Sequence, residues 1–144
     1  MITKRTREVA ASREKVWEIV GDPYHHPRWW PRVDRVEGVT RAGWTSVLMS
    51  ARGNTVRADW TVEVNQQPTE RRWTQEIDGT PFERLFKRNS VEARLEHGAA
   101  GGTRVTLLFD QQPRGLARFL PFMLRRAMGR QLDEALDGLA QAVE

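Results

Sequence analysis

The chain has 144 residues, of which 39% are apolar and 29% are charged, and its formal net charge is +4. This length allows one domain with a substantial core, and this composition excludes an intrinsically disordered chain. The lack of cysteine excludes disulfides, thiolate metal sites and cysteine nucleophiles, and no run approaches the roughly 20 apolar residues of a membrane span.

The N-terminal part of the sequence predicts one strand followed by two short helical segments. A polar strand is expected over 2–9. Ser12 is a typical N-cap, and the residues after it place an apolar face on a helix that ends near Gly21. The segment 23–31 contains three prolines and the pairs His-His and Trp-Trp, so it predicts a short helical turn or a structured loop.

The middle of the chain predicts a meander of antiparallel strands. In 54–65 every second residue from Val56 to Val64 is apolar and the residues between them are polar, which is typical of a half-buried strand. Asp59 and Glu63 fall on the polar side, which makes them poor general bases. Further strands are predicted at 33–41, 44–51, 70–78, 82–96 and 103–112, separated by turn-like segments.

The strand predicted at 82–96 has two apolar phases. Phe82 and Phe86 alternate in one phase, whereas Val91 and Leu95 belong to the other. A continuous strand cannot place both sets on one face, so we expect a bulge or a strong bend near 86–90.

The C-terminal segment predicts a long helix. Apolar residues recur at intervals of three and four from Leu116 to Val143. Pro121 lies about one turn in, so a kink or a restart is expected there. Gly129 and Gly138 each weaken the helix by about 1 kcal/mol relative to alanine, so packing against the sheet must supply the difference.

The motifs Val9–Trp17 (VAASREKVW) and Gly101–Thr106 (GGTRVT), the Asp-Pro and Trp-Pro pairs in Asp22–Pro31, and the final helix together resemble the START-like (SRPBCC) superfamily, in its polyketide cyclase/dehydrase and lipid-transport branch. The resemblance implies an α+β helix-grip fold, with a curved antiparallel sheet of about seven strands around the C-terminal helix. It spans 1–144 as a single START-like domain. It also implies a cavity for apolar or aromatic ligands between sheet and helix, but no particular reaction.

The residues expected to line such a cavity come from the inward faces of the strands and the helix. Trp60 and Trp73 would form aromatic walls, with Arg71 and Gln75 as polar handles for a ligand oxygen. The alternative is that the tryptophans are ordinary core residues and the arginine reaches solvent. The predicted ligand-binding set is Trp30, Trp60, Arg71, Trp73, Gln75, Phe86, Met123 and Ala127.

Four residues are available for catalysis, although the sequence places none of them. An arginine such as Arg88 or Arg84 would bind an anion if it faced the cavity and would be unremarkable if it faced water. His26 could act as a general acid or base at the cavity mouth, or simply belong to a surface loop. The candidates are Arg71, Arg88, His26 and Tyr24.

No metal or cofactor is expected. His25 and His26 are adjacent, but no third or fourth ligand follows at useful spacing. Trp29 and Trp30 are expected to plug the mouth of the barrel.

The distribution of charge along the chain indicates which partners are expected. Basic residues, mostly arginine, are spread along the chain between acidic ones, so no nucleic-acid partner is expected. The exception is the start of the last helix, where Arg118, Arg125 and Arg126 lie near Phe119 and Phe122. These arginines either pair within the chain or form a docking surface for an acidic protein or an anionic lipid.

Three functions are therefore compatible with the sequence. The first is binding of an apolar small molecule, such as a lipid, a quinone or a polyketide-like compound. The second is a polyketide aromatase/cyclase that acts by aldol closure and dehydration, and the third is a protein-interaction module that uses the basic start of the last helix. We expect a cytoplasmic protein, because no apolar stretch follows the basic N-terminus, and a monomer or homodimer.

Overall fold

A computed structural model describes residues 1–144. Four 3-10 turns, η1 (Pro23–His25), η2 (Pro81–Arg84), η3 (Ala99–Gly101) and η4 (Gly115–Phe119), connect the main elements. These elements are β1 (Ile2–Val9), α1 (Arg13–Val20), α2 (His26–Trp29), β2 (Val33–Glu37), β3 (Gly43–Met49), β4 (Thr55–Gln66), β5 (Glu70–Glu76), β6 (Phe86–His97), β7 (Thr103–Pro113) and α3 (Pro121–Val143).

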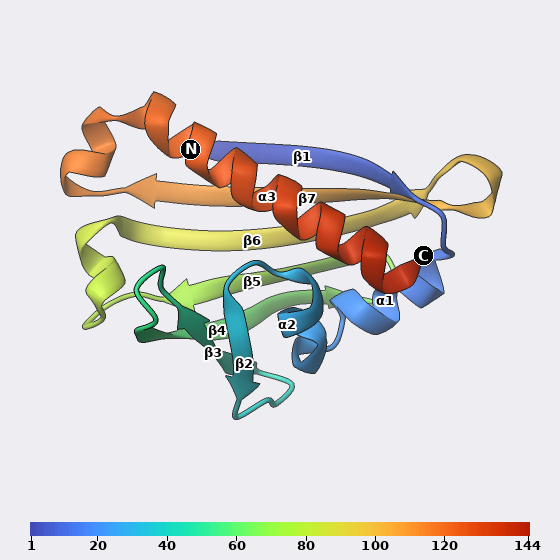
Figure 1. The fold of residues 1–144 in the computed structure, drawn as a ribbon, viewed down its shortest axis with the longest axis horizontal. Coiled ribbons are helices and arrows are strands. Elements are labelled where there is room, and N and C mark those ends of the chain that lie inside the picture. Colours follow the sequence, from blue (N-terminus) through green and yellow to red (C-terminus); the bar gives the residue numbers. More distant parts are fainter.

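The seven strands form one antiparallel sheet in the order β1-β7-β6-β5-β4-β3-β2. Strands β2 to β7 pair with their neighbours in sequence, and β1 completes the sheet by pairing with β7. Figure 1 shows α3 lying across one face of this sheet, with α1 and α2 beside its C-terminal end. The predicted fold class, with a sheet that holds the C-terminal helix and short helices after the first strand, is confirmed.

The short helices begin where the sequence provides caps. The Ser12 hydroxyl accepts a hydrogen bond from the backbone N–H of Lys15 at 3.2 Å, and this cap starts α1. The Asp22 carboxylate accepts one from the N–H of Tyr24 at 3.0 Å and starts η1, which runs directly into α2. The helical turn predicted within 23–31 is confirmed.

The predicted strand at 82–96 is wrong in its first four residues. Pro81 to Arg84 form η2, because Pro81 has the backbone angle of a first helical residue and the Thr80 side chain accepts a hydrogen bond from the N–H of Phe82. Strand β6 begins only at Phe86. The register between β6 and β7 shifts between Phe86 and Arg88, which confirms the bulge and brings Phe86 to the same face as Val91.

Two other boundaries differ from the prediction or refine it. Strand β2 ends at Glu37 rather than near residue 41, because Gly38 has a φ of +60° and turns the chain away. The C-terminal helix restarts at Pro121, as expected: η4 ends at Phe119 and α3 begins with Pro121 at its first turn.

The core lies between the sheet and the C-terminal part of α3. On the sheet, Val105 and Leu107 of β7 are fully buried, and Leu132 and Leu139 of α3 are also fully buried. The fully buried residues of α3 begin at Gly129, and of the first two turns Met128 alone packs against the core, partly buried.

The backbones of α2 and α3 meet at Gly138. A Cβ atom added there would lie 2.5 Å from the carbonyl oxygen of Trp29 and 2.9 Å from its Cα. The glycine therefore allows the close approach of the two helices that buries Trp29.

Candidate functional site

A hollow with a volume of about 590 Å³ lies between the sheet and α3. Twenty-six residues line it, of which 14 are hydrophobic. The charged members of the lining, Arg32, Arg130 and Glu134, are all exposed, so they mark its mouth. The inner part of the cavity is thus apolar or neutral.

Aromatic side chains form much of the inner wall. The ring of Trp30 packs edge-on against Phe109 at 5.9 Å between centroids and against Trp73 at 6.3 Å. Trp60 stacks on the buried Trp44 at 6.5 Å and also lines the cavity. Such faces suit a flat or flexible apolar ligand.

His26 lies in the inner wall and is only 3% exposed. Three indoles surround its ring: those of Trp44 at 5.1 Å, Trp29 at 5.6 Å and Trp73 at 5.7 Å between centroids. Burial, together with the positive charge of Arg71, lowers the pKa of His26 to about 3. The imidazole is therefore neutral at physiological pH, and its Nε2 has no hydrogen-bond partner. The alternative of a surface loop is wrong for this residue.

Three amide side chains, which we call the amide row, cross the floor of the cavity on neighbouring strands. Asn89 of β6 donates to the Oε1 of Gln75 on β5 at 2.9 Å, and Gln111 of β7 donates to the Oδ1 of Asn89 at 3.0 Å. The same Gln111 nitrogen lies 3.3 Å from the sulfur of Met128 on α3. All three amides are more than nine-tenths buried and line the cavity.

The amide row leaves two polar atoms without partners. These are the Nε2 of Gln75 and the Oε1 of Gln111. A buried donor or acceptor without a partner costs about 1–3 kcal/mol, so these atoms gain from any ligand group that pairs with them.

Arg71 does not line the cavity, contrary to its expected role as a polar handle. Its side chain shares the inward face with Trp73 and Gln75 but lies further along β5, where it is 5% exposed. The guanidinium donates to Asn65 at 3.1 Å and lies 5.8 Å from the centroid of the Trp44 ring. Burial lowers the pKa of Arg71.

The other expected ligand-binding residues divide in the same way. Met123 does not line the cavity and is 63% exposed on the first turn of α3. The remaining six of the set do line it: Trp30, Trp60, Trp73, Gln75, Phe86 and Ala127. Trp29, expected to plug the mouth with Trp30, is instead buried in the core.

Besides Arg71, two more of the catalytic candidates lie outside the cavity. Arg88 forms an ion pair of 2.8 Å with Asp110 on the outer face of the sheet. Of the two orientations considered for this arginine, it therefore has the one that faces water. Tyr24 is 63% exposed and does not line the cavity. Arg84 is exposed on η2 and is also absent from the lining.

Sequence reasoning missed Asn89, Gln111 and Ser46, which all line the cavity. The signal was present for two of them. Gln111 follows Val105, Leu107 and Phe109 in the inward phase of its strand, and Asn89 precedes Val91 in the same way. In both strands a polar residue continues the inward phase of the apolar ones.

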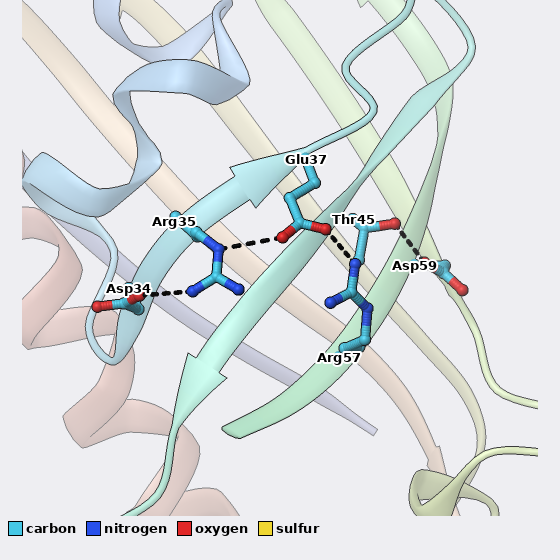
Figure 2. Close-up of polar contacts among 6 residues, drawn as sticks. All are labelled: Asp34, Arg35, Glu37, Thr45, Arg57 and Asp59. Carbon is cyan, nitrogen blue, oxygen red and sulfur yellow. Dashed lines mark hydrogen bonds and ion pairs between the residues drawn. The ribbon is translucent and has the colours of Figure 1, made fainter. Parts of the chain in front are cut away.

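The outer face of β2, β3 and β4 holds several carboxylates, among them Asp59, which the sequence placed away from the core. Figure 2 shows Arg35 between Asp34 and Glu37, Glu37 bonded in turn to Arg57, and Asp59 accepting from Thr45. The two arginines lower the pKa of Glu37 through these hydrogen bonds. Each of these carboxylates already accepts a hydrogen bond and is accessible to water, so this face has no group suited to proton transfer.

A surface at the start of α3, which we call the α3 patch, combines exposed apolar residues with unpaired arginines. The guanidinium of Arg118 lies 4.9 Å from the centroid of the Phe119 ring. None of its three arginines lies within salt-bridge distance of a carboxylate, which removes the alternative of pairing within the chain. The α3 patch consists of Leu116, Arg118, Phe119, Leu120, Phe122, Met123, Arg125 and Arg126.

No three histidine, aspartate or glutamate side chains lie close enough together to hold a metal ion. No helix is both long enough and apolar enough to cross a bilayer.

Comparisons with known proteins agree with this geometry. Residues 2–144 match the model of the family described as polyketide cyclase / dehydrase and lipid transport. No curated protein matches the sequence.

Solved structures share the fold at low sequence identity. A START superfamily protein from Mycobacterium smegmatis is 16% identical with a TM-score of 0.77, and the match covers 99% of this chain and 96% of that one. The protein TTHA0849 from Thermus thermophilus is 19% identical with a TM-score of 0.76, covering 99% and 97%. The di-domain ARO/CYC protein BexL from the BE-7585A biosynthetic pathway is 13% identical with a TM-score of 0.79, covering all of this chain and 50% of that one.

Proposed function

The chain belongs to the polyketide cyclase/dehydrase and lipid transport family, and from this premise we propose that it binds an apolar small molecule between the sheet and α3. The observation that carries the proposal is the cavity of about 590 Å³ with its aromatic walls and neutral interior. A hollow of this size lies within the range of small-molecule sites. Transfer of apolar ligand surface into it is favourable by about 25 cal/mol per Å².

The alternative is an aromatase/cyclase, which the family description and the likeness to BexL favour. Such an enzyme must take a proton from carbon and stabilise an enolate oxygen. His26 is the one catalytic candidate that lines the cavity, and a pKa of about 3 makes it a weak base. Because Arg71, Arg88 and Tyr24 do not line the cavity, we place binding first and cyclisation second.

Filling the cavity should abolish binding without unfolding the protein. Val56 points into the cavity from β4, and a tryptophan there suits the strand and occupies ligand space. We expect wild type to bind the neutral dye Nile red with increased fluorescence, and V56W to bind it at least about tenfold more weakly, a difference of about 1.4 kcal/mol.

The matched control is R57W, on the same strand. Arg57 faces the opposite side, where its only contact is the exposed pair with Glu37 (Figure 2), so its loss costs little. Equal binding by V56W and wild type, or no binding by wild type, would contradict the proposal. Incubation with a poly-β-ketone chain separates the two functions, because a carrier returns it with unchanged mass whereas a cyclase returns it lighter by the mass of water.

The α3 patch supports a further part of the proposal, namely contact with an anionic membrane surface. Its exposed aromatic and aliphatic residues would enter the interface, and the unpaired arginines would meet lipid phosphates. Self-association through the same patch would bring like charges together. It adjoins the cavity, because Ala127, the residue that follows Arg126, lines it.

Reversing two charges in the α3 patch should prevent vesicle binding. We expect wild type to sediment with vesicles that contain phosphatidylglycerol and not with pure phosphatidylcholine vesicles. The double variant R125E/R126E should lose at least about 90% of the bound fraction, since each basic residue near such a surface contributes about 1 kcal/mol. R41E/R52E, which changes two exposed arginines elsewhere by the same charge, is the control. Equal loss in both variants would indicate net charge alone, and retrieval of an acidic protein without vesicle binding would indicate a protein partner.

A further inference from the structure

We infer that the cavity selects a neutral ligand that carries a carbonyl or hydroxyl oxygen, which the amide row and His26 recognise, and that it discriminates against carboxylates. This inference rests on the proposed function, because it specifies the ligand class of the same cavity. It adds Asn89 and Gln111, which the sequence did not identify, to Gln75 and His26, which it did.

The amide row presents both kinds of hydrogen-bonding group. Each primary amide has two N–H donors and an acceptor oxygen. The bonds between Gln75, Asn89 and Gln111 use the oxygen of the first and the nitrogen of the last. A donor remains free at the Gln75 end and an acceptor at the Gln111 end. Turning every amide over only exchanges the two ends, so the row keeps one free donor and one free acceptor.

These free groups match a carbonyl or a hydroxyl. A ligand carbonyl accepts from the free amide donor, and a hydroxyl can donate to the free oxygen as well. His26 adds a third group, since its unpartnered Nε2 belongs to a neutral imidazole in the same lining. An enclosed site built to hydrogen-bond an oxygen rejects an analogue that leaves its polar atoms unpaired.

A carboxylate would lack a counter-charge in the inner cavity. Arg71, whose positive charge acts on His26, does not line the cavity, and one nitrogen of its guanidinium donates to Asn65. His26 stays neutral because burial and Arg71 oppose its protonation. The charged residues of the lining, Arg32, Arg130 and Glu134, are exposed at the mouth. Burying an unpaired ionised carboxylate is strongly unfavourable.

The experiment compares two ligands of similar length that differ in their polar end. Binding of 2-tridecanone and of dodecanoate is measured at pH 8 by displacement of Nile red. We expect wild type to bind the ketone at least about tenfold more tightly than the carboxylate. The triple variant Q75L/N89L/Q111L replaces the whole row, so no amide is left without its partner. It should bind 2-tridecanone at least about tenfold more weakly than wild type does, because the ketone oxygen loses its hydrogen-bond donor.

The control is T74V/S90A on the outer face of β5 and β6, which removes the hydrogen bond of 2.8 Å between Thr74 and Ser90 and that of 2.6 Å from Thr74 to Glu63. It should bind both ligands as wild type does. Dodecanoate binding as tight as ketone binding in wild type would overturn the inference and leave the proposed function intact. Failure of Nile red and both ligands to bind would overturn the proposed function itself. The wild-type comparison decides the point even if the triple variant does not fold.

Discussion

Between pH 7 and pH 4.5, wild type is expected to lose about 2–3 kcal/mol more free energy of unfolding than the variant H26F. The reason is the lowering of the His26 pKa from 6.5 to about 3. Below pH 6.5 the unfolded chain takes up a proton at this histidine, whereas the folded protein does not until about pH 3. The unfolded state therefore binds more protons in this window, and acid favours unfolding.

The groups around His26 support this direction. Three tryptophan rings enclose it, and the charges nearest to it are Arg71 and, when protonated, His25, both of which oppose a positive imidazolium. Phenylalanine preserves the aromatic contacts and does not titrate. Urea unfolding followed by circular dichroism at the two pH values measures the difference. H97Q changes an exposed histidine and should behave as wild type does; an H26F variant with the full acid sensitivity of wild type would refute the assignment.

The second large effect concerns the two glycines of α3, which appear equivalent in the sequence. G138A is expected to lower the free energy of unfolding by about 2–3 kcal/mol, because the new methyl group would meet the backbone of Trp29, which cannot move without disturbing the packing of α2 on α3. G129A is expected to be neutral or to stabilise the protein by up to about 1 kcal/mol.

The difference follows from what each methyl group would meet. At Gly129 the nearest atoms belong to the guanidinium of Arg5, the end of a flexible and partly exposed side chain that can turn away. Urea unfolding of both variants tests the contrast. Equal effects at the two positions would show that helix propensity, rather than the contact with Trp29, determines the outcome.

The fold could be predicted because its periodic signals are local. The alternation in 54–65 and the three- and four-residue spacing after Leu116 reflect burial on one face, and both elements form as expected. The start of β6 was missed because Thr80 and Pro81 form a capped 3-10 turn, and the alternation of Phe82 with Phe86 imitated a strand.

The site was predicted less completely, because alternation gives the face of a strand but not the position along it. Arg71, Trp73 and Gln75 share the inward face of β5. Only the last two reach the cavity, since the end of the strand that carries Arg71 lies beneath Trp44. Met123 has the correct helical spacing, but α3 is exposed there. The surroundings of His26 depend on residues far apart in the sequence, so no local pattern could reveal them.

The uneven burial of α3 has an evolutionary consequence. The buried residues Leu132, Leu136 and Leu139 hold the helix against the core, whereas Ala127, Gln131 and Glu134, which line the cavity, recur on another face of the same helix. Selection for folding and selection for ligand would therefore act on largely separate faces of one helix. Ligand preference can diversify by substitutions on the cavity face while the buried face preserves the architecture. A fold with this division can acquire new ligands with little loss of folding stability.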